Sequence, residues 1–203
     1  MPSMSELPAK AVLEAQLAGG VALYDVSHVL PVHRTERYAV RDAGAIKRVY
    51  VHHSGALGAA GYAGARNSAA YSVAPRVGSV KGWPGAAYHF WICAEPLRDR
   101  DGNICVLRMN RDETRCYHTG GVCNAHGVGV VLQGNTSAAP LAESHEECLE
   151  ALLPWLRRRH DLDAEWLSWH AESKRFGAPK NKASCPGKHA ESWLGAYRER
   201  ERT

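Results

Sequence analysis

The sequence predicts a single α/β domain, and three observations support this fold class. The chain has 203 residues, which is enough for one well-packed domain and does not require a second. Hydrophobic residues make up 45% and charged residues 23%, a composition typical of globular proteins that excludes disordered and membrane-spanning chains. Short apolar or alternating runs, typical of strands, are interspersed with segments of helical periodicity.

The N-terminal part predicts one helix, one strand and an extended arm. An amphipathic helix is expected over residues 6–18, ended by the glycine pair that follows it. A short strand is expected over residues 21–26, and residues 27–45 predict an extended arm. We therefore assign an N-terminal helix and arm to residues 1–44 and the main domain to residues 45–203, packed together as one compact domain.

The strands of the main domain are predicted from short runs rich in β-branched and aromatic residues between turn signals. They are expected at residues 46–51, 86–93, 104–108, 115–118 and 127–133. The tripeptide Asp101-Gly102-Asn103 is a strong signal for a hairpin turn between the second and third of these strands.

Two helices are predicted in the C-terminal half of the chain. Residues 141–160 place leucines near a 3.6-residue period, which indicates one buried face. Pro140 suits the first turn of this helix, and Pro154 is expected to kink it. A last helix is expected over residues 189–200, with apolar side chains on one face.

Three segments carry the residues with catalytic chemistry. A strand ends in His52-His53, a glycine-rich turn at 82–90 leads into aromatic residues, and a later segment runs from His170 to Cys185. One histidine from the first segment, a second histidine and a thiolate form the ligand set of a hydrolytic Zn²⁺ that keeps its fourth position for water. Because side chains alternate along a strand, only one of His52 and His53 can face the metal, and alternation alone leaves both open.

These segments, in this order, resemble the zinc-dependent N-acetylmuramoyl-L-alanine amidases, which include T7-type phage lysozymes and the catalytic peptidoglycan recognition proteins. The resemblance covers roughly residues 45–195. It implies a central mixed sheet flanked by helices, with a zinc groove at the surface and a helix within residues 56–78 that lines the active site. It also implies that His52, His170 and Cys185 are the zinc ligands.

The same resemblance implies two catalytic residues. Tyr88 matches the active-site tyrosine, and Lys182 lies close to the position of a catalytic lysine. Relatives usually place that lysine two residues before the last ligand, where this chain has Ala183. Recycling amidases often carry a glutamate on the strand that holds Val131 and Gln133, so its absence favours tyrosine plus lysine. The alternatives are a Tyr88 that only packs and a Lys182 that is only solvated.

Three further residues are expected to line the substrate groove. His118 resembles a histidine that similar amidases hold near the substrate, and Trp83 and Asn124 are placed to contact the peptide stem. The alternatives are a hydrogen-bonded core role for His118 and turn packing for Trp83.

Charge and cysteine usage bear on compartment and partners. The net charge is +4, with basic clusters at 157–159 and 198–202 that are either solvated helix ends or an attraction to an anionic wall. We expect synthesis in the cytoplasm and no stable membrane association, because the N-terminus lacks a secretory signal pattern and no apolar run approaches the roughly 20 residues of a membrane span. The six scattered cysteines are expected to be buried thiols, with a Cys116–Cys123 bridge as the alternative.

The predicted function is hydrolysis of the amide between N-acetylmuramic acid and L-alanine in peptidoglycan, by a monomeric zinc enzyme without a nucleic-acid partner. The expected setting is a phage or prophage endolysin that reaches the wall through a holin-type lesion. Two rival functions stay open: a non-catalytic peptidoglycan-binding module of the same fold, and a cytoplasmic recycling amidase. The retained Cys185 disfavours the first rival and the missing strand carboxylate disfavours the second.

Overall fold

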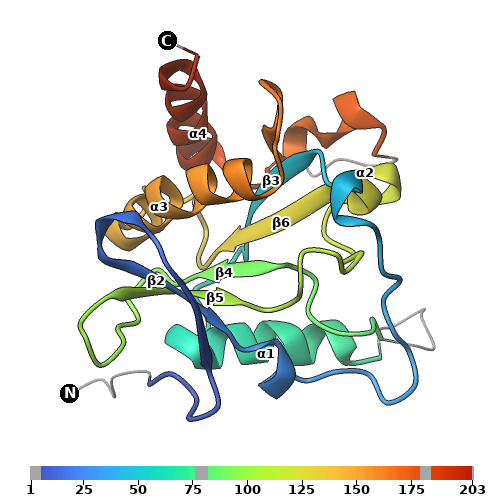
Figure 1. Ribbon diagram of the computed structural model, residues 1–203, viewed down its shortest axis with the longest axis vertical. Coiled ribbons are helices and arrows are strands. Elements are labelled where there is room, and N and C mark those ends of the chain that lie inside the picture. The colour runs from blue at the N-terminus through green and yellow to red at the C-terminus, as the bar shows by residue number, and fades with distance from the viewer. Residues whose placement is uncertain (1–5, 76–81, 179–183, 203) are drawn as a thin grey trace.

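A seven-stranded mixed sheet forms the centre of the molecule. The computed structural model describes residues 6–75, 82–178 and 184–202. The strands lie in the order β1-β2-β5-β4-β6-β3-β7 (Figure 1). They are β1 Val12–Gln16, β2 Val21–Asp25, β3 Arg48–His53, β4 Phe90–Ile92, β5 Ile104–Arg108, β6 Gly127–Leu132 and β7 Leu167–Trp169.

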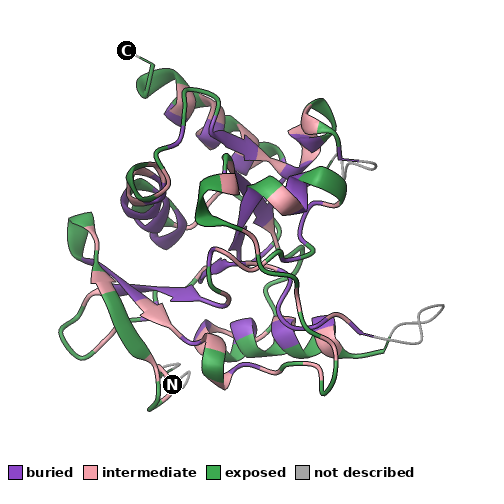
Figure 2. Cartoon of the chain, turned by 45° about the vertical axis from the view of Figure 1, so that its right-hand side comes forward, coloured by how far each residue is buried: buried purple, intermediate pink, exposed green. Residues whose placement is uncertain are grey.

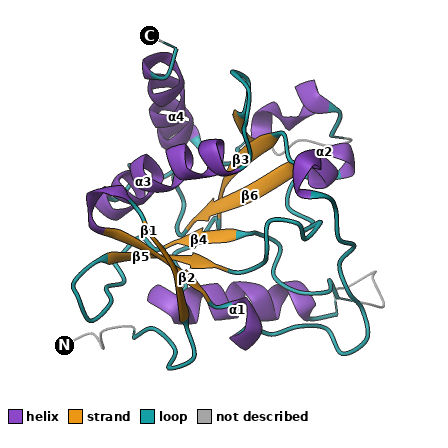
Figure 3. Ribbon diagram, viewed as in Figure 1, coloured by secondary structure: helices purple, strands orange, loops and turns teal. Residues whose placement is uncertain are grey.

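Helices cover both faces of this sheet (Figure 3). One face packs against α3, Glu143–Arg159, and α4, Lys188–Arg200. The other packs against α1, Gly61–Val73, while the short α2, Gly121–His126, leads directly into β6. This arrangement confirms the predicted single α/β domain with a central mixed sheet and flanking helices. Among the described residues, no helix is long and apolar enough to cross a membrane.

The parallel strands at the centre of the sheet position the site. β3 pairs in parallel with both β6 and β7, and its side chains alternate between the two faces. Val49 and Val51 lie in the core beneath α3, whereas His52 aligns with Val131, which packs on the α1 side. β3 and β6 are buried along most of their length, in contrast to the exposed edge strand β1 (Figure 2).

The prediction of a helix over residues 6–18 is wrong. Residues 12–16 form β1, which pairs antiparallel with β2 through a turn at Gly19 and Gly20, both of which have positive φ. Glycines tolerate that conformation, so the pair makes a hairpin rather than a helix end. An ion pair of 2.8 Å between Glu14 and the buried Arg108 of β5 ties this hairpin to the sheet. Pairing along an available sheet edge therefore outweighs local helix propensity.

The predicted strand at 115–118 is also wrong. The structure has an isolated bridge between Val40 and Thr114 there, and the Arg115 amide donates to the Ala39 carbonyl of the arm. The strand predicted at 86–93 is shorter in the structure, Phe90–Ile92, because residues 86–89 are irregular and bent. The predictions at 21–26, 46–51, 104–108 and 127–133 hold within two residues.

Both predicted C-terminal helices are confirmed, as is a helix within residues 56–78. Pro140 precedes α3 rather than lying in its first turn, and Pro154 lies inside a helix that continues past it. Sequence reasoning did not find α2 or β7, which are only six and three residues long. Between β2 and β3 the arm contains two short helical turns, Ser27–Val29 and Ala43–Ala45, within otherwise extended backbone.

Candidate metal centre

His52 enters the site from the middle of the sheet. It is the fifth residue of β3 and is completely buried on the face opposite α3. The next side chain, His53, points the other way along the alternating strand, and its Nδ1 lies 3.3 Å from Thr136 Oγ1. The structure thus brings His52, and not His53, to the predicted cluster.

His170 reaches the same place from the neighbouring strand. β7 pairs in parallel with β3, with Trp169 aligned to Val51, and His170 follows at the start of the helical turn His170–Phe176. A residue at the carboxyl end of β7 therefore lies beside His52 at the carboxyl end of β3. His170 is buried, with 8% of its surface exposed.

Cys185 is held by the turn that follows β6. The Thr136 hydroxyl donates to the Pro186 carbonyl, and the His189 amide donates to the Thr136 carbonyl at 3.2 Å. Gly187 has a φ of +99°, and a Cβ there would lie 2.4 Å from the Ser137 amide nitrogen, so only glycine fits. Close docking of this loop buries the Cys185 side chain.

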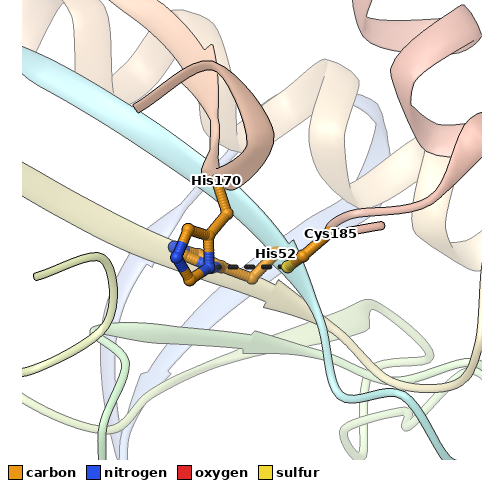
Figure 4. Close-up of side chains that lie close together, drawn as sticks. All are labelled: His52, His170 and Cys185. Atoms are coloured by element: carbon orange, nitrogen blue, oxygen red, sulfur yellow. Dashed lines mark hydrogen bonds between the residues drawn. The ribbon is translucent and has the colours of Figure 1, made fainter. Parts of the chain in front are cut away.

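The three side chains converge on one point (Figure 4). His52 Nδ1 lies 3.2 Å from His170 Nδ1 and 3.7 Å from Cys185 Sγ, and all three ligand atoms lie within 4.8 Å of one another. Tetrahedral zinc, with bonds of about 2.05 Å to nitrogen and about 2.3 Å to sulfur, separates two nitrogens by about 3.3 Å and nitrogen from sulfur by about 3.6 Å. The donor atoms and their spacing therefore fit zinc.

His118 lies behind His52 rather than in an open groove. Its Nδ1 is 3.1 Å from His52 Nε2, and its Nε2 is 3.1 Å from the Gly127 carbonyl oxygen. The ring is buried, and burial lowers the pKa of His118 well below its ordinary value, which keeps the ring neutral. This placement favours the hydrogen-bonded alternative over a direct role in binding substrate.

Tyr88 stands beside the cluster on the segment that leads into β4. Its ring centroid is 5.1 Å from that of His52, and the residue is half-buried. The Asn110 amide donates to the Tyr88 carbonyl at 2.7 Å, and the Tyr38 hydroxyl contacts the Gly85 carbonyl at 3.1 Å. These contacts hold the backbone, so the phenol ring is kept next to His52.

The remaining predicted residues differ in their placement. Trp83 is half-buried and meets Tyr117 edge to face, with ring centroids 5.9 Å apart. Asn124 is buried, and its Oδ1 accepts hydrogen bonds from the Thr119 and Gly120 amides, both at 2.9 Å, so it holds the turn before α2. Lys182 lies outside the described residues.

On the strand where recycling amidases often carry a glutamate, this chain has Val131 and Gln133. Val131 packs in the core on the α1 side. The Gln133 amide donates to the Leu57 and Ala59 carbonyls at 2.7 and 2.6 Å and accepts from the Ala94 amide at 3.2 Å. Gln133 therefore braces the loop before α1.

All six cysteines are free thiols, so the alternative Cys116–Cys123 bridge is not formed. Thr136 and Gly187 were missed by sequence reasoning, although they hold the Cys185 loop. The signal that could have found Gly187 is its place directly after Cys185-Pro186.

Fold and site together define an α/β domain with a buried His-His-Cys cluster. Residues 42–188 match the sequence model of the N-acetylmuramoyl-L-alanine amidases, and this match spans more than half of the chain. The chain therefore belongs to the N-acetylmuramoyl-L-alanine amidase family. No curated protein sequence matches the chain.

Several solved structures share the fold. The amidase LysC from Clostridium intestinale has a TM-score of 0.56 at 17% identity, covering 86% of this chain and 95% of its own. Drosophila PGRP-LB has a TM-score of 0.63 at 16% identity, covering 87% and 94%. The endolysin of Thermus scotoductus bacteriophage Ph2119 has a TM-score of 0.56 at 16% identity, covering 81% and 91%. At these identities the likeness shows the fold alone.

Proposed function

We propose that this protein is a zinc-dependent hydrolase that cleaves the amide between the lactyl group of N-acetylmuramic acid and L-alanine in peptidoglycan. The observation that carries the proposal is the spacing of His52, His170 and Cys185, which fits tetrahedral zinc in a chain of the amidase family. His52, His170 and Cys185 are the residues that would hold the ion.

Held by these two imidazoles and this thiolate, zinc would supply Lewis acidity and would lower the pKa of a bound water to about 7. The chain itself contributes shape and hydrogen bonds. Tyr88, fixed beside His52, donates a hydrogen bond from its phenol group to the oxygen of the scissile carbonyl as negative charge develops there. Lys182 is the proposed second donor, and its positive charge stabilises the same oxygen.

The proposed setting is the lysis of bacterial walls by a monomeric endolysin made in the cytoplasm and released through a membrane lesion. Trp83, on the same segment as Tyr88, is proposed to line the groove for the peptide stem. Asn124 is proposed to act there through the turn that it holds rather than through its own amide.

Digestion of purified sacculi followed by mass spectrometry tests the proposal. We expect a new free L-alanine amine on stem peptides, released by the wild-type protein and not by Cys185→Ser. Binding to sacculi without release of peptide would instead support a non-catalytic binding module. Cleavage of soluble muropeptides with intact sacculi untouched would support a recycling amidase.

A further inference from the structure

A directed chain of hydrogen bonds runs through His118 to His52. The Gly127 carbonyl can only accept, so the 3.1 Å contact with His118 Nε2 requires the hydrogen of His118 to sit on that nitrogen. In a neutral ring, His118 Nδ1 is then an acceptor. It lies 3.1 Å from His52 Nε2, on the opposite side of the His52 ring from Nδ1, which contacts His170 and Cys185.

We propose that His118 is a positioning residue that fixes the tautomer of His52. With a hydrogen on His52 Nε2, the contact with His118 is a hydrogen bond; in the other tautomer two lone pairs would oppose each other at 3.1 Å. The favoured tautomer leaves the Nδ1 lone pair of His52 directed at His170 and Cys185, ready for a metal before any metal arrives. The inference rests on the proposed zinc site.

Close packing fixes the orientation of His118 itself. Gly129 lies against the ring, and a Cβ at that position would lie 2.8 Å from His118 Cγ. The Gly127 carbonyl that orients the ring is also held in place. Arg41 Nη1 donates to this carbonyl at 2.9 Å and to the backbone carbonyl of Asn124 at 2.8 Å. Arg41, in the arm before β3, is therefore linked to His52 through the Gly127 carbonyl and the His118 ring.

Thr119 provides the matched control. Its hydroxyl lies 2.6 Å from His118 Nδ1 and, because that nitrogen is an acceptor, donates to it beside His52; this contact is made to His118 and does not decide which nitrogen of His52 carries the hydrogen. Replacing it by valine removes this contact without interrupting the chain from Gly127 through His118 to His52.

The first test is long-range proton–nitrogen NMR of the metal-free wild-type protein, labelled with ¹⁵N at histidine. We expect both His52 and His118 to carry their hydrogen on Nε2. A His52 ring with its hydrogen on Nδ1 would overturn the inference, whatever the protein does to peptidoglycan. Because the measurement needs neither substrate nor metal, it separates this inference from the proposed function.

The second test compares zinc affinity in variants, measured by competition with a chromophoric chelator. His118→Leu keeps the bulk but removes the acceptor, and we expect affinity to fall by about 10- to 100-fold, the usual effect of losing a partner behind a metal ligand. His118→Asn places an oxygen near the former Nδ1 and should restore most of the affinity, and Thr119→Val should match wild type. Equal losses in His118→Asn and His118→Leu would refute a role for the acceptor. If His118→Leu does not fold, the wild-type NMR result decides.

Discussion

Thr136 fixes the carbonyl of Pro186 and thereby the position of Cys185. Its hydroxyl donates to that carbonyl and also contacts His53 Nδ1 at 3.3 Å. The turn after β6 thus holds the last predicted zinc ligand, although the two segments are 50 residues apart in the sequence. Packing against this turn, rather than local preference, places the thiol.

Gly187→Ala should disrupt this docking. The new Cβ would collide with the Ser137 amide, and the positive φ of +99° is strained for alanine. We expect a lower melting temperature and weaker zinc binding, measured by thermal unfolding and chelator competition. Gly195→Ala is the matched control: it lies in α4 with open space around it and should be stabilising by about 0.5–1 kcal/mol. Similar behaviour of the two variants would contradict this account of the loop.

Zinc content and the thiol ligand provide the next prediction. The purified protein should carry close to one zinc per chain and lose activity in a strong chelator. Cys185→Ser should lose most of its zinc, because a hydroxyl is a much poorer ligand than a thiolate. Cys148→Ala removes another buried thiol, on the core-facing side of α3, and should keep its zinc. Metal analysis that finds an active, zinc-free protein would end the zinc proposal.

Tyr88→Phe should separate catalysis from metal binding. The ring stays beside His52, so zinc is retained, but the hydrogen bond to the developing oxyanion is lost. We expect turnover on sacculi to fall by roughly 10²-fold, the scale for loss of one such donor. A variant with wild-type turnover would show that Tyr88 only packs.

Lys182→Ala should likewise keep its zinc and lose turnover by roughly 10²-fold, because it removes a charge that stabilises the same oxyanion. Lys180→Ala is the matched comparison on the same segment. Full activity in Lys182→Ala together with an inactive Lys180→Ala would move the catalytic role by two positions.

Buried histidines should make the metal-free protein sensitive to acid. Burial lowers the pKa of His89 to about 3 and that of His145 to about 4, from an ordinary value of 6.5. Below about pH 6.5 these histidines become protonated in the unfolded chain but stay neutral in the folded chain. Their contribution to the free energy of unfolding is therefore fully present above that pH and is lost as pH drops towards 4. His145→Asn should remove about 3 kcal/mol of this pH dependence, measured by urea unfolding at several pH values. An unchanged pH dependence would contradict a neutral buried imidazole.

The sequence named His52, His170 and Cys185 through their match to a family pattern, and the structure brings these three side chains together. Alternation along a strand allows only one of His52 and His53 to face the cluster, the family resemblance names His52, and the structure places His52 there. The sequence failed where distant pairing decides: residues 12–16 become a strand only because β2 offers an edge. It also could not place His118, since the contact that defines its environment joins residues 66 positions apart. The Tyr88 and Lys182 roles stay predictions.

Sequence distance within the cluster has a consequence for biosynthesis. His52 lies 118 residues before His170 and 133 residues before Cys185. A nascent chain that has emerged only as far as β6 contains one of the three clustered residues, His52, and so cannot form the cluster. The His52-His170-Cys185 cluster is therefore assembled only near the end of translation, once the chain has been made as far as Cys185.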